Sequence, residues 1–202
     1  MRKLLFIIFL LPASFTWSQG NINIFETKTM TFYGLDFTHA KCMGTEKFPS
    51  PEEVITVHIP QWNQIFMDEE IGEDVGKPYK KKEVFYDTLI YAKNAQINAS
   101  ELYIDHPYML ERKEIKAYIK GFADYNSSGL GLIYLVEALN RSEKYLSVWV
   151  VFFDKKTGDV LLSEPIRSKG KGRHFDDYWR NAFLEMFDTS AKEYKAWKKI
   201  YN

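Results

Sequence analysis

The sequence has little cysteine: Cys42 is the single cysteine among its 202 residues. That excludes an internal disulfide framework and any cysteine-rich zinc or iron–sulfur site. An excess of charge of one sign is also lacking, because 27 Lys and Arg residues balance 27 Asp and Glu residues. Since nucleic-acid-binding proteins normally carry a basic surplus, the balance argues against that class.

Complete motifs of known enzyme chemistry are lacking as well, and we expect no cofactor. What the chain does have is apolar material: 46% of its residues are hydrophobic, and 15 Phe, 13 Tyr and 5 Trp residues are present. This composition excludes an intrinsically disordered chain and predicts a folded protein with a substantial core.

Residues 1–18 have the pattern of a secretory signal. Arg2 and Lys3 precede an unbroken apolar run, Leu4–Leu11, and small residues lie near Ser18. The run is too short to span a bilayer, for which about 20 apolar residues are needed. We therefore expect cleavage before Gln19, export to the periplasm or the exterior, a single domain over 19–202, and no membrane span after cleavage.

The first half of the remaining chain predicts a strand, a helix and a second strand. Residues 29–39 alternate apolar and polar side chains, and Gly34 indicates a bulge or a close backbone approach. Ser50 begins a capping box before a helical pattern, which Pro60 is expected to kink or split. The β-branched and aromatic residues of 84–92 favour a strand.

A charged segment separates that helix from the second strand. Five carboxylates in 68–74 are followed by four lysines in 77–82, with glycine and proline between them. Such short charge runs are typical of a solvated loop.

The second half predicts a helix, three strands and a last helix. Residues 113–122 have helical spacing, and three apolar segments, 132–139, 145–153 and 160–166, follow with short connections. Short connections require antiparallel neighbours, and 145–153 is apolar on both faces, as expected of a central strand. An aromatic stripe of helical period occupies 176–201, where a cap at Thr189 or Ser190 predicts a division into two helices.

This order of elements predicts an α+β fold. Helices, including the aromatic-rich C-terminal one, are expected to pack on a mixed or antiparallel sheet that ends in a three-strand meander.

Three segments carry a resemblance: Gly129–Glu137 (GLGLIYLVE), Trp149–Leu161 (WVVFFDKKTGDVL) and Tyr178–Asn181 (YWRN). Over about residues 129–187 the chain is similar to small uncharacterised exported proteins of Bacteroidota-type bacteria, with a weaker match around Gly34–Phe37. The resemblance implies an envelope protein of unassigned function and transfers no catalytic residue.

A glycine-interrupted basic loop before the last helix is the clearest candidate binding site. It runs Ser168-Lys169-Gly170-Lys171-Gly172-Arg173-His174, so glycines can expose backbone N–H groups beside several cationic side chains. An anionic ligand or acidic partner would bind Lys169, Lys171, Arg173 and His174. The alternative is a solvated basic loop, and Asp176 and Asp177 compete for the helix end.

Three carboxylates inside strand patterns, Asp36, Glu137 and Glu164, are the candidates for acid–base chemistry. Two of them in one cleft could form a glycosidase pair, with carboxyl groups roughly 5 to 9.5 Å apart. The structural alternative is that each is paired with a lysine or arginine or lies at a sheet rim.

A metal site is not expected. His39 and Cys42 are close in sequence but zinc needs three or four ligands, and His58, His106 and His174 lie on separate elements. Cys42 is interpreted as a small buried hydrophobic residue, with a reactive thiol as the alternative.

Two function hypotheses follow. The favoured one is a non-enzymatic exported module that binds an envelope protein or an anionic envelope component. The other is a small hydrolase of envelope carbohydrate that uses the strand carboxylates. The arrangement of those carboxylates distinguishes the two.

Overall fold

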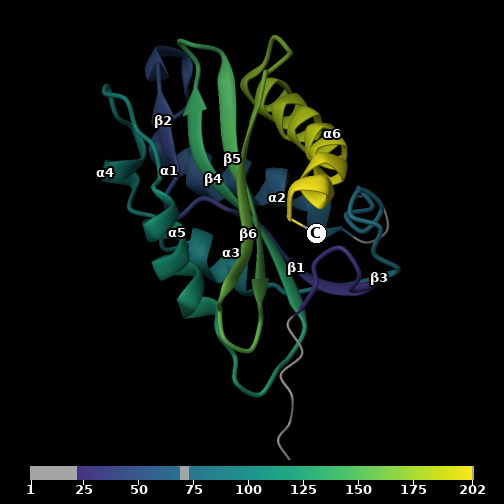
Figure 1. The fold of residues 1–202 in the computed structure, drawn as a ribbon. Coiled ribbons are helices and arrows are strands. Elements are labelled where there is room, and N and C mark those ends of the chain that lie inside the picture. The colour runs from purple at the N-terminus through teal and green to yellow at the C-terminus, as the bar shows by residue number, and fades with distance from the viewer. Residues whose placement is uncertain (1–21, 69–72, 202) are drawn as a thin grey trace, which may run out of the picture.

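The computed structural model describes residues 22–68 and 73–201, which form a mixed sheet with helices on both faces (Figure 1). The strand order is β3-β1-β4-β5-β6, and β2 also pairs with β4. β1 is parallel to β3 and β4, whereas β4, β5 and β6 form an antiparallel meander, which confirms the predicted α+β class. The strands are β1 Thr29–Asp36, β2 Lys41–Met43, β3 Glu83–Tyr86, β4 Leu130–Asn140, β5 Tyr145–Asp154 and β6 Val160–Ser168.

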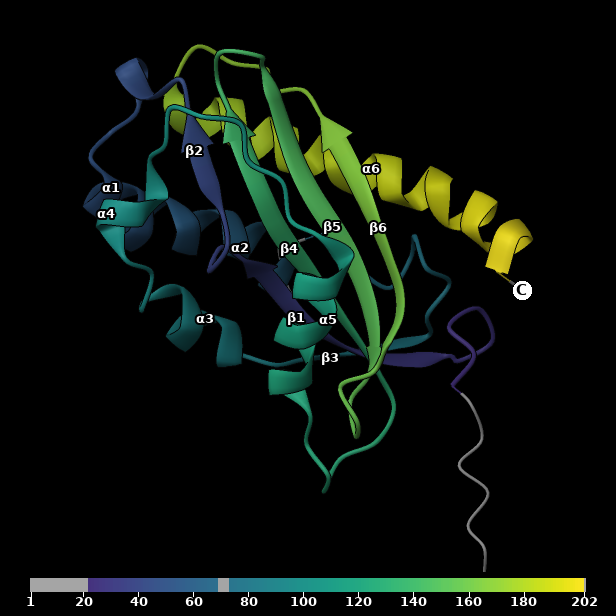
Figure 2. The same ribbon diagram turned by 60° about the vertical axis from the view of Figure 1, so that its left-hand side comes forward.

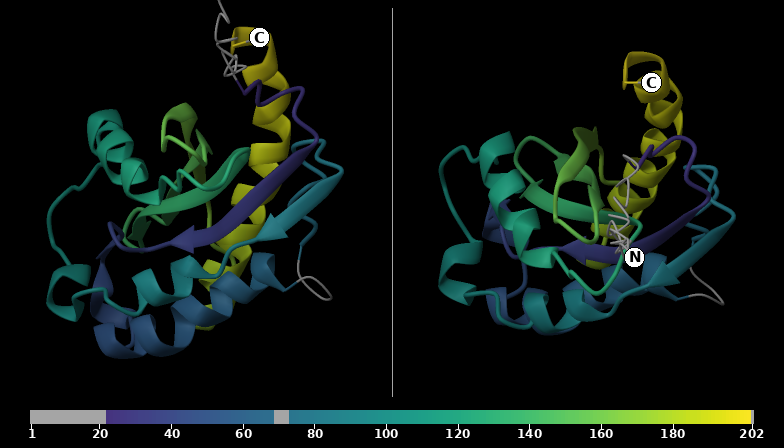
Figure 3. Two further views of the ribbon diagram at one scale, coloured as in Figure 1. Left: turned by 90° about the horizontal axis from the view of Figure 1, so that it is seen from below. Right: turned by 60° about the horizontal axis from the view of Figure 1, so that its bottom comes forward.

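The α-helices are α1 Pro51–Glu53, α2 Ile59–Met67, α3 Leu89–Asn94, α4 Ala99–Leu102, α5 Arg112–Ile119 and α6 Phe175–Tyr201. α2 and α6 cover one face of the sheet and α5 covers the other (Figures 2 and 3). Within 22–68 and 73–201, none of the helices combines the length and the apolar character needed to cross a bilayer.

The two sides of β5 belong to two hydrophobic clusters, because successive side chains of a strand point to opposite faces. The larger cluster, with α2 and α6, takes Leu146, Val148, Val150 and Phe152. The smaller one, with α5, takes Trp149, Val151 and Phe153. β5 is therefore a central strand packed on both faces, as its apolar sequence predicts.

The bulge predicted at Gly34 is present in β1. The pairing with β4 shifts register between Phe32 and Leu35, and Gly34 has φ +91°. A Cβ atom there would lie 2.6 Å from Oδ1 of Asn63, which accepts a hydrogen bond from the Leu35 N–H at 2.8 Å. Asn94 bonds the same strand, accepting from Phe37 N–H and donating to the Leu35 carbonyl, each at 2.8 Å. The side-chain amides of Asn63 and Asn94 thus bond the backbone of this segment beyond the end of β3, in place of a neighbouring strand.

The helix predicted after Ser50 begins and breaks as expected. Ser50 Oγ accepts the Glu53 N–H at 3.2 Å, and Pro51 occupies the first turn. A π-helical segment, η2 Val54–His58, then separates α1 from α2, with Pro60 in the first turn of α2. Since proline has no N–H to donate to the preceding turn, the change of helical pitch occurs where the regular bond is missing.

The prediction of a strand across 84–92 is wrong in its second half. β3 ends at Tyr86, and α3 begins at Leu89. Asp87 marks the change, because its backbone N–H still donates to the Phe32 carbonyl while its Oδ1 accepts the Leu89 N–H at 2.9 Å.

The predicted division of the C-terminal helix is also wrong, because α6 is continuous over 27 residues. The hydroxyls of Thr189 and Ser190 donate to the carbonyls of Glu185 and Phe187 instead of capping a new helix. Ser190 Oγ also accepts the Tyr79 hydroxyl at 2.7 Å, which satisfies a buried polar group inside the core.

The loop predicted across 68–82 is present in its described part, but one of its lysines is not solvated. Lys81 is 8% exposed, and its ammonium donates to the carbonyls of Ile24 and Thr27 at 2.5 and 2.9 Å. Burial lowers the pKa of Lys81 to about 8. This lysine ties the start of the described chain to the core.

Candidate functional site

Three connections meet at one end of the sheet because of its topology. β2 and β4 are parallel, so their carboxyl ends coincide, and β6, antiparallel to β5, ends there too. The segment after β2, the turn between β4 and β5, and the loop between β6 and α6 therefore lie side by side, at the top of Figure 1.

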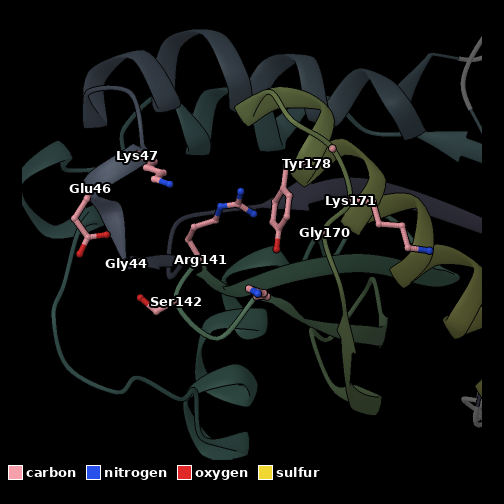
Figure 4. Close-up of a pocket in the computed structure, with 10 residues that line it drawn as sticks. Gly44, Glu46, Lys47, Arg141, Ser142, Gly170, Lys171 and Tyr178 are labelled. Carbon is pink, nitrogen blue, oxygen red and sulfur yellow. The ribbon is translucent and has the colours of Figure 1, made fainter.

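These connections surround an open hollow of about 500 Å³, which we call the basic hollow (Figure 4). Its size is within the range of small-molecule sites, about 300–1,000 Å³. The lining comprises three glycines, one serine, one tyrosine and five charged residues. The charged residues are Glu46, Lys47, Arg141, Lys144 and Lys171. Four cations against one carboxylate make this a local positive region in a chain whose total charge is balanced.

Arg141 and Tyr178 form the centre of the basic hollow. The Arg141 guanidinium carbon lies 3.6 Å from the centre of the Tyr178 ring, and Figure 4 shows the two side chains facing each other. Among the described residues Arg141 has no ion pair and no side-chain hydrogen bond, so its guanidinium donors are free of protein acceptors. Tyr178 is 6% exposed, and its hydroxyl has no hydrogen-bond partner.

The glycine-interrupted loop is fixed against α6. The Lys169 N–H donates to Glu185 at 3.0 Å, and Asn181 donates to the Lys171 carbonyl at 2.8 Å. Gly170 lies against the Tyr178 ring so closely that a Cβ atom would be 2.0 Å from Cε1. The glycine is required there because any side chain would displace the tyrosine ring.

The basic loop residues predicted from sequence divide into two groups. Lys171, with Gly170 and Gly172, lines the basic hollow, whereas Lys169, Arg173 and His174 are exposed outside its lining. Sequence reasoning did not find Arg141, Tyr178, Lys47 or Lys144 as site residues. The local signal for Arg141 is the short segment Asn140–Glu143, whose pattern predicts a connection between two strands and no binding site.

Glu137 is buried and accepts hydrogen bonds from three neutral groups. Its donors are the Leu110 N–H at 2.8 Å, the Ser147 hydroxyl at 2.5 Å and the Trp149 indole N–H at 3.1 Å. The carboxylate therefore fastens the segment before α5 to β4 and β5. That is a structural role, with neutral donors in place of the expected cation.

Asp36, at the end of β1, is satisfied in the same way. It accepts from Thr38 N–H at 2.8 Å, from the Thr38 hydroxyl at 2.7 Å and from the Tyr118 hydroxyl at 2.6 Å. Burial, together with the nearby Asp36 carboxylate, raises the pKa of Tyr118. The His39 ring packs edge-on against Tyr118 at 4.4 Å, and burial lowers the pKa of His39.

Glu164, on β6, is paired with an arginine as the structural alternative predicts. Its Oε1 lies 3.2 Å from Arg112 Nη2 and accepts the Tyr201 hydroxyl at 2.7 Å. All three strand carboxylates, Asp36, Glu137 and Glu164, lie outside the lining of the basic hollow. Their contacts favour structural roles, so the geometry offers no support for the hydrolase hypothesis.

The histidines are dispersed. His58 packs against Trp62 and Phe175, and its Nδ1 lies 3.3 Å from Asp176, whereas His106 and His174 are exposed. In the part of the chain that the structure describes, no three or more His, Cys, Asp or Glu side chains are grouped to hold a metal ion. Cys42 is buried, and burial raises the pKa of its thiol.

No family model matches the sequence, and no curated protein matches it either. Among solved structures, the crystal structure of lipoprotein GNA1162 from Neisseria meningitidis aligns over 84% of this chain and 96% of that chain. The two share 11% sequence identity with a TM-score of 0.33, a likeness too low to support an inference about this chain.

Proposed function

We propose that this protein is an exported, non-enzymatic binding module, and that the basic hollow recognises an anionic group of another envelope component. Export rests on the signal pattern of residues 1–18. The anion preference rests on the hollow, where four cationic side chains and one carboxylate line the same space.

The observation that carries the proposal is the Arg141–Tyr178 stack. A guanidinium has five N–H donors arranged to bind carboxylate or phosphate oxygens in a bidentate way. Here the tyrosine ring orients the guanidinium, and no described carboxylate neutralises it. An oriented arginine without a protein partner is suited to an external anion.

The lining also argues against catalysis. It contains no histidine, and Glu46 is its sole carboxylate, so a paired acid and base are missing from this space. The strand carboxylates are engaged elsewhere by Leu110, Tyr118, Arg112 and their neighbours. Binding without chemistry is the function that this arrangement supports best.

Two double variants with equal charge changes test the location of the site. R141Q/K171Q removes two cations from the hollow, whereas K169Q/R173Q removes two from the same end of the molecule but outside the lining. Each protein is expressed from the full chain, purified, immobilised and incubated with envelope extract. We expect R141Q/K171Q to reduce capture of anionic material at least about 10-fold, since each charged hydrogen bond contributes about 1.5–3 kcal/mol.

The control variant K169Q/R173Q should retain capture within about twofold. Equal capture by wild type and R141Q/K171Q, or loss confined to K169Q/R173Q, would overturn the assignment of the site to the basic hollow. Loss in both variants would indicate binding through net charge alone and would also contradict the proposal. Circular dichroism of each variant checks that the fold is unchanged.

A further inference from the structure

The lining of the basic hollow restricts the ligand's chemistry beyond its charge. None of its residues is aliphatic: backbone at Gly44, Gly170 and Gly172, the Ser142 hydroxyl and charged side chains make up most of the surface. An acyl chain or an apolar side chain would meet only glycine backbone, the stems of lysine and arginine side chains and the Tyr178 ring, with no aliphatic residue to pack against. A ligand rich in hydroxyl groups would find donors and acceptors around it.

The aromatic ring in the lining, that of Tyr178, is covered by other groups of the protein. Arg141 stacks on Tyr178 at 3.6 Å, and Gly170 lies against the same ring. A nucleobase normally gains much of its affinity by stacking on an aromatic face. Since that face is covered, the hollow is poorly suited to a nucleotide.

The charge count favours phosphate over carboxylate. Four cations and one carboxylate leave an excess of three positive charges. A carboxylate offers one negative charge and two oxygens, whereas a phosphate monoester carries about 1.5–2 negative charges at pH 7 and three acceptor oxygens. The phosphate monoester comes closer to neutralising the hollow and to using its donors.

The Tyr178 hydroxyl is an independent indication of a missing acceptor. The side chain is 6% exposed, and the hydroxyl is buried in the wall of the hollow without a partner. A buried unsatisfied donor costs about 1–3 kcal/mol, so it is normally paired in the functional state. A phosphate oxygen bound beside the Arg141 guanidinium, which stays stacked on the ring, gives this hydroxyl an acceptor.

We infer that the basic hollow binds the phosphate monoester of a sugar or similar polyhydroxylated compound. This inference rests on the proposed function and specifies its ligand. Arg141 and Tyr178 hold the phosphate, Lys47 and Lys144 add positive charge from the lining, and Ser142 with the glycine backbone faces the hydroxyl groups. The Lys171 ammonium points away from Arg141 (Figure 4) and adds only to the wider positive field.

The test is calorimetric titration of the purified protein at fixed ionic strength with matched probes. Glucose 6-phosphate and glucuronate share a pyranose ring and differ in the group at carbon 6. Glucose tests the sugar without an anionic group, inorganic phosphate tests the phosphate without a sugar, and adenosine monophosphate tests a sugar phosphate that carries a nucleobase. We expect glucose 6-phosphate to bind at least about 10-fold tighter than each of the other four.

Two variants connect the affinity to the site. R141Q should weaken glucose 6-phosphate at least about 10-fold, and Y178F should weaken it several-fold. Because the Tyr178 hydroxyl has no partner, Y178F should keep or raise the stability to urea, which a merely structural hydroxyl would not do. R167Q is the matched control, since Arg167 also stacks on a tyrosine ring, Tyr145, at 4.7 Å but lines the neighbouring hollow of about 640 Å³.

The outcomes separate this inference from the proposed function. Glucuronate binding as tightly as glucose 6-phosphate would overturn the choice of a phosphate, and adenosine monophosphate binding as tightly would overturn the choice of a ligand without a nucleobase, even while R141Q/K171Q abolishes capture from the extract. Binding of no probe, with capture still dependent on Arg141 and Lys171, would overturn it as well. Equal affinity of R141Q and wild type for glucose 6-phosphate would overturn both proposals at this site.

Discussion

The Glu137 carboxylate lies on β4 at 4% exposure, and its three hydrogen-bond donors, from Leu110, Ser147 and Trp149, are all neutral. A buried charge of this kind is tolerated because three donors replace its hydration. Its position inside a strand made it a catalytic candidate from sequence, whereas its contacts assign it to holding the segment before α5.

The change E137A should therefore destabilise the protein without affecting the basic hollow. It leaves three buried donors without an acceptor, and each costs about 1–3 kcal/mol, so we expect a loss of at least about 3 kcal/mol in the free energy of unfolding. Urea denaturation followed by tryptophan fluorescence measures it. The matched control E143A removes an exposed carboxylate from the turn after β4. A free energy of unfolding for E137A equal to that of E143A would contradict the structural role.

At the residue scale, sequence could predict only the local part of the site. Lys171 was found because glycines and cations alternate within one loop. Arg141 and Tyr178 were not found, because neither residue is unusual in its own segment. Their stack joins the turn after β4 to α6, and the two residues are 37 positions apart in the sequence. Buried pairings such as Asn63 with Leu35 were equally invisible, since they depend on how α2 crosses β1.

The edge strand β6 is protected from pairing with another chain. Arg112 Nη1 donates to the Ser163 carbonyl, so this carbonyl points away from β5 and is already occupied. Pro165, two residues along the same outward-facing row, has no N–H to offer. An arginine cap and a proline are two of the ways in which exposed sheet edges are blocked.

The change R112A should expose this edge. We expect stability to fall by about 1–3 kcal/mol, because Arg112 loses its bonds to the Ser163 carbonyl and hydroxyl as well as its partly solvated pair with Glu164, and we expect association at high concentration to increase. Static light scattering across a concentration series measures the average mass. K113A is the control, since Lys113 lies next on α5 and, within the described residues, forms an ion pair with Glu111 and none with β6. Identical mass profiles for R112A, K113A and wild type would show that the arginine does not protect the edge.

Secondary-structure prediction succeeded where the apolar periodicity and the length of a segment indicated the same kind of element. It failed where one element ends and the next begins, and within the long C-terminal helix. The meander strands and α5 were found because their apolar spacing is unambiguous. β3 and α3 were merged because both contain β-branched and aromatic residues, and the boundary depends on Asp87 bonding to β1 and to Leu89. The split of α6 was wrong because Thr189 and Ser190 serve the helix and the core, which their sequence does not reveal.

At the scale of the whole molecule, the antiparallel half of the sheet was predictable and the parallel half was not. Short connections between β4, β5 and β6 allow only hairpins. The pairing of β1 with β3 and β4 needs long crossovers through helices on both faces, and no local feature states which strands become neighbours. The basic hollow depends on that topology, because β2 brings Gly44 and Lys47 beside the β4–β5 turn.

The described structure is compatible with removal of residues 1–18. By Ile24 the chain is already held, because the Ile24 carbonyl accepts from the Lys81 ammonium and from the Tyr194 hydroxyl at 2.8 Å. These contacts lie beyond the expected cleavage point, so a chain cleaved before Gln19 keeps them.

We therefore expect a bacterial host that expresses the full chain to export it and to cleave it before Gln19. N-terminal sequencing of the exported fraction should read Gln19-Gly20-Asn21-Ile22, and the intact mass should fall from 23.8 kDa by the mass of residues 1–18. The variant I8D places a charge in the middle of the apolar run and should leave the uncleaved protein inside the cell, because the run must be apolar to be recognised. K28D, a charge reversal within the mature chain, should be exported normally. Uncleaved wild-type protein confined to the cytoplasm would contradict export, and with it the proposal that the ligand of the basic hollow belongs to the envelope.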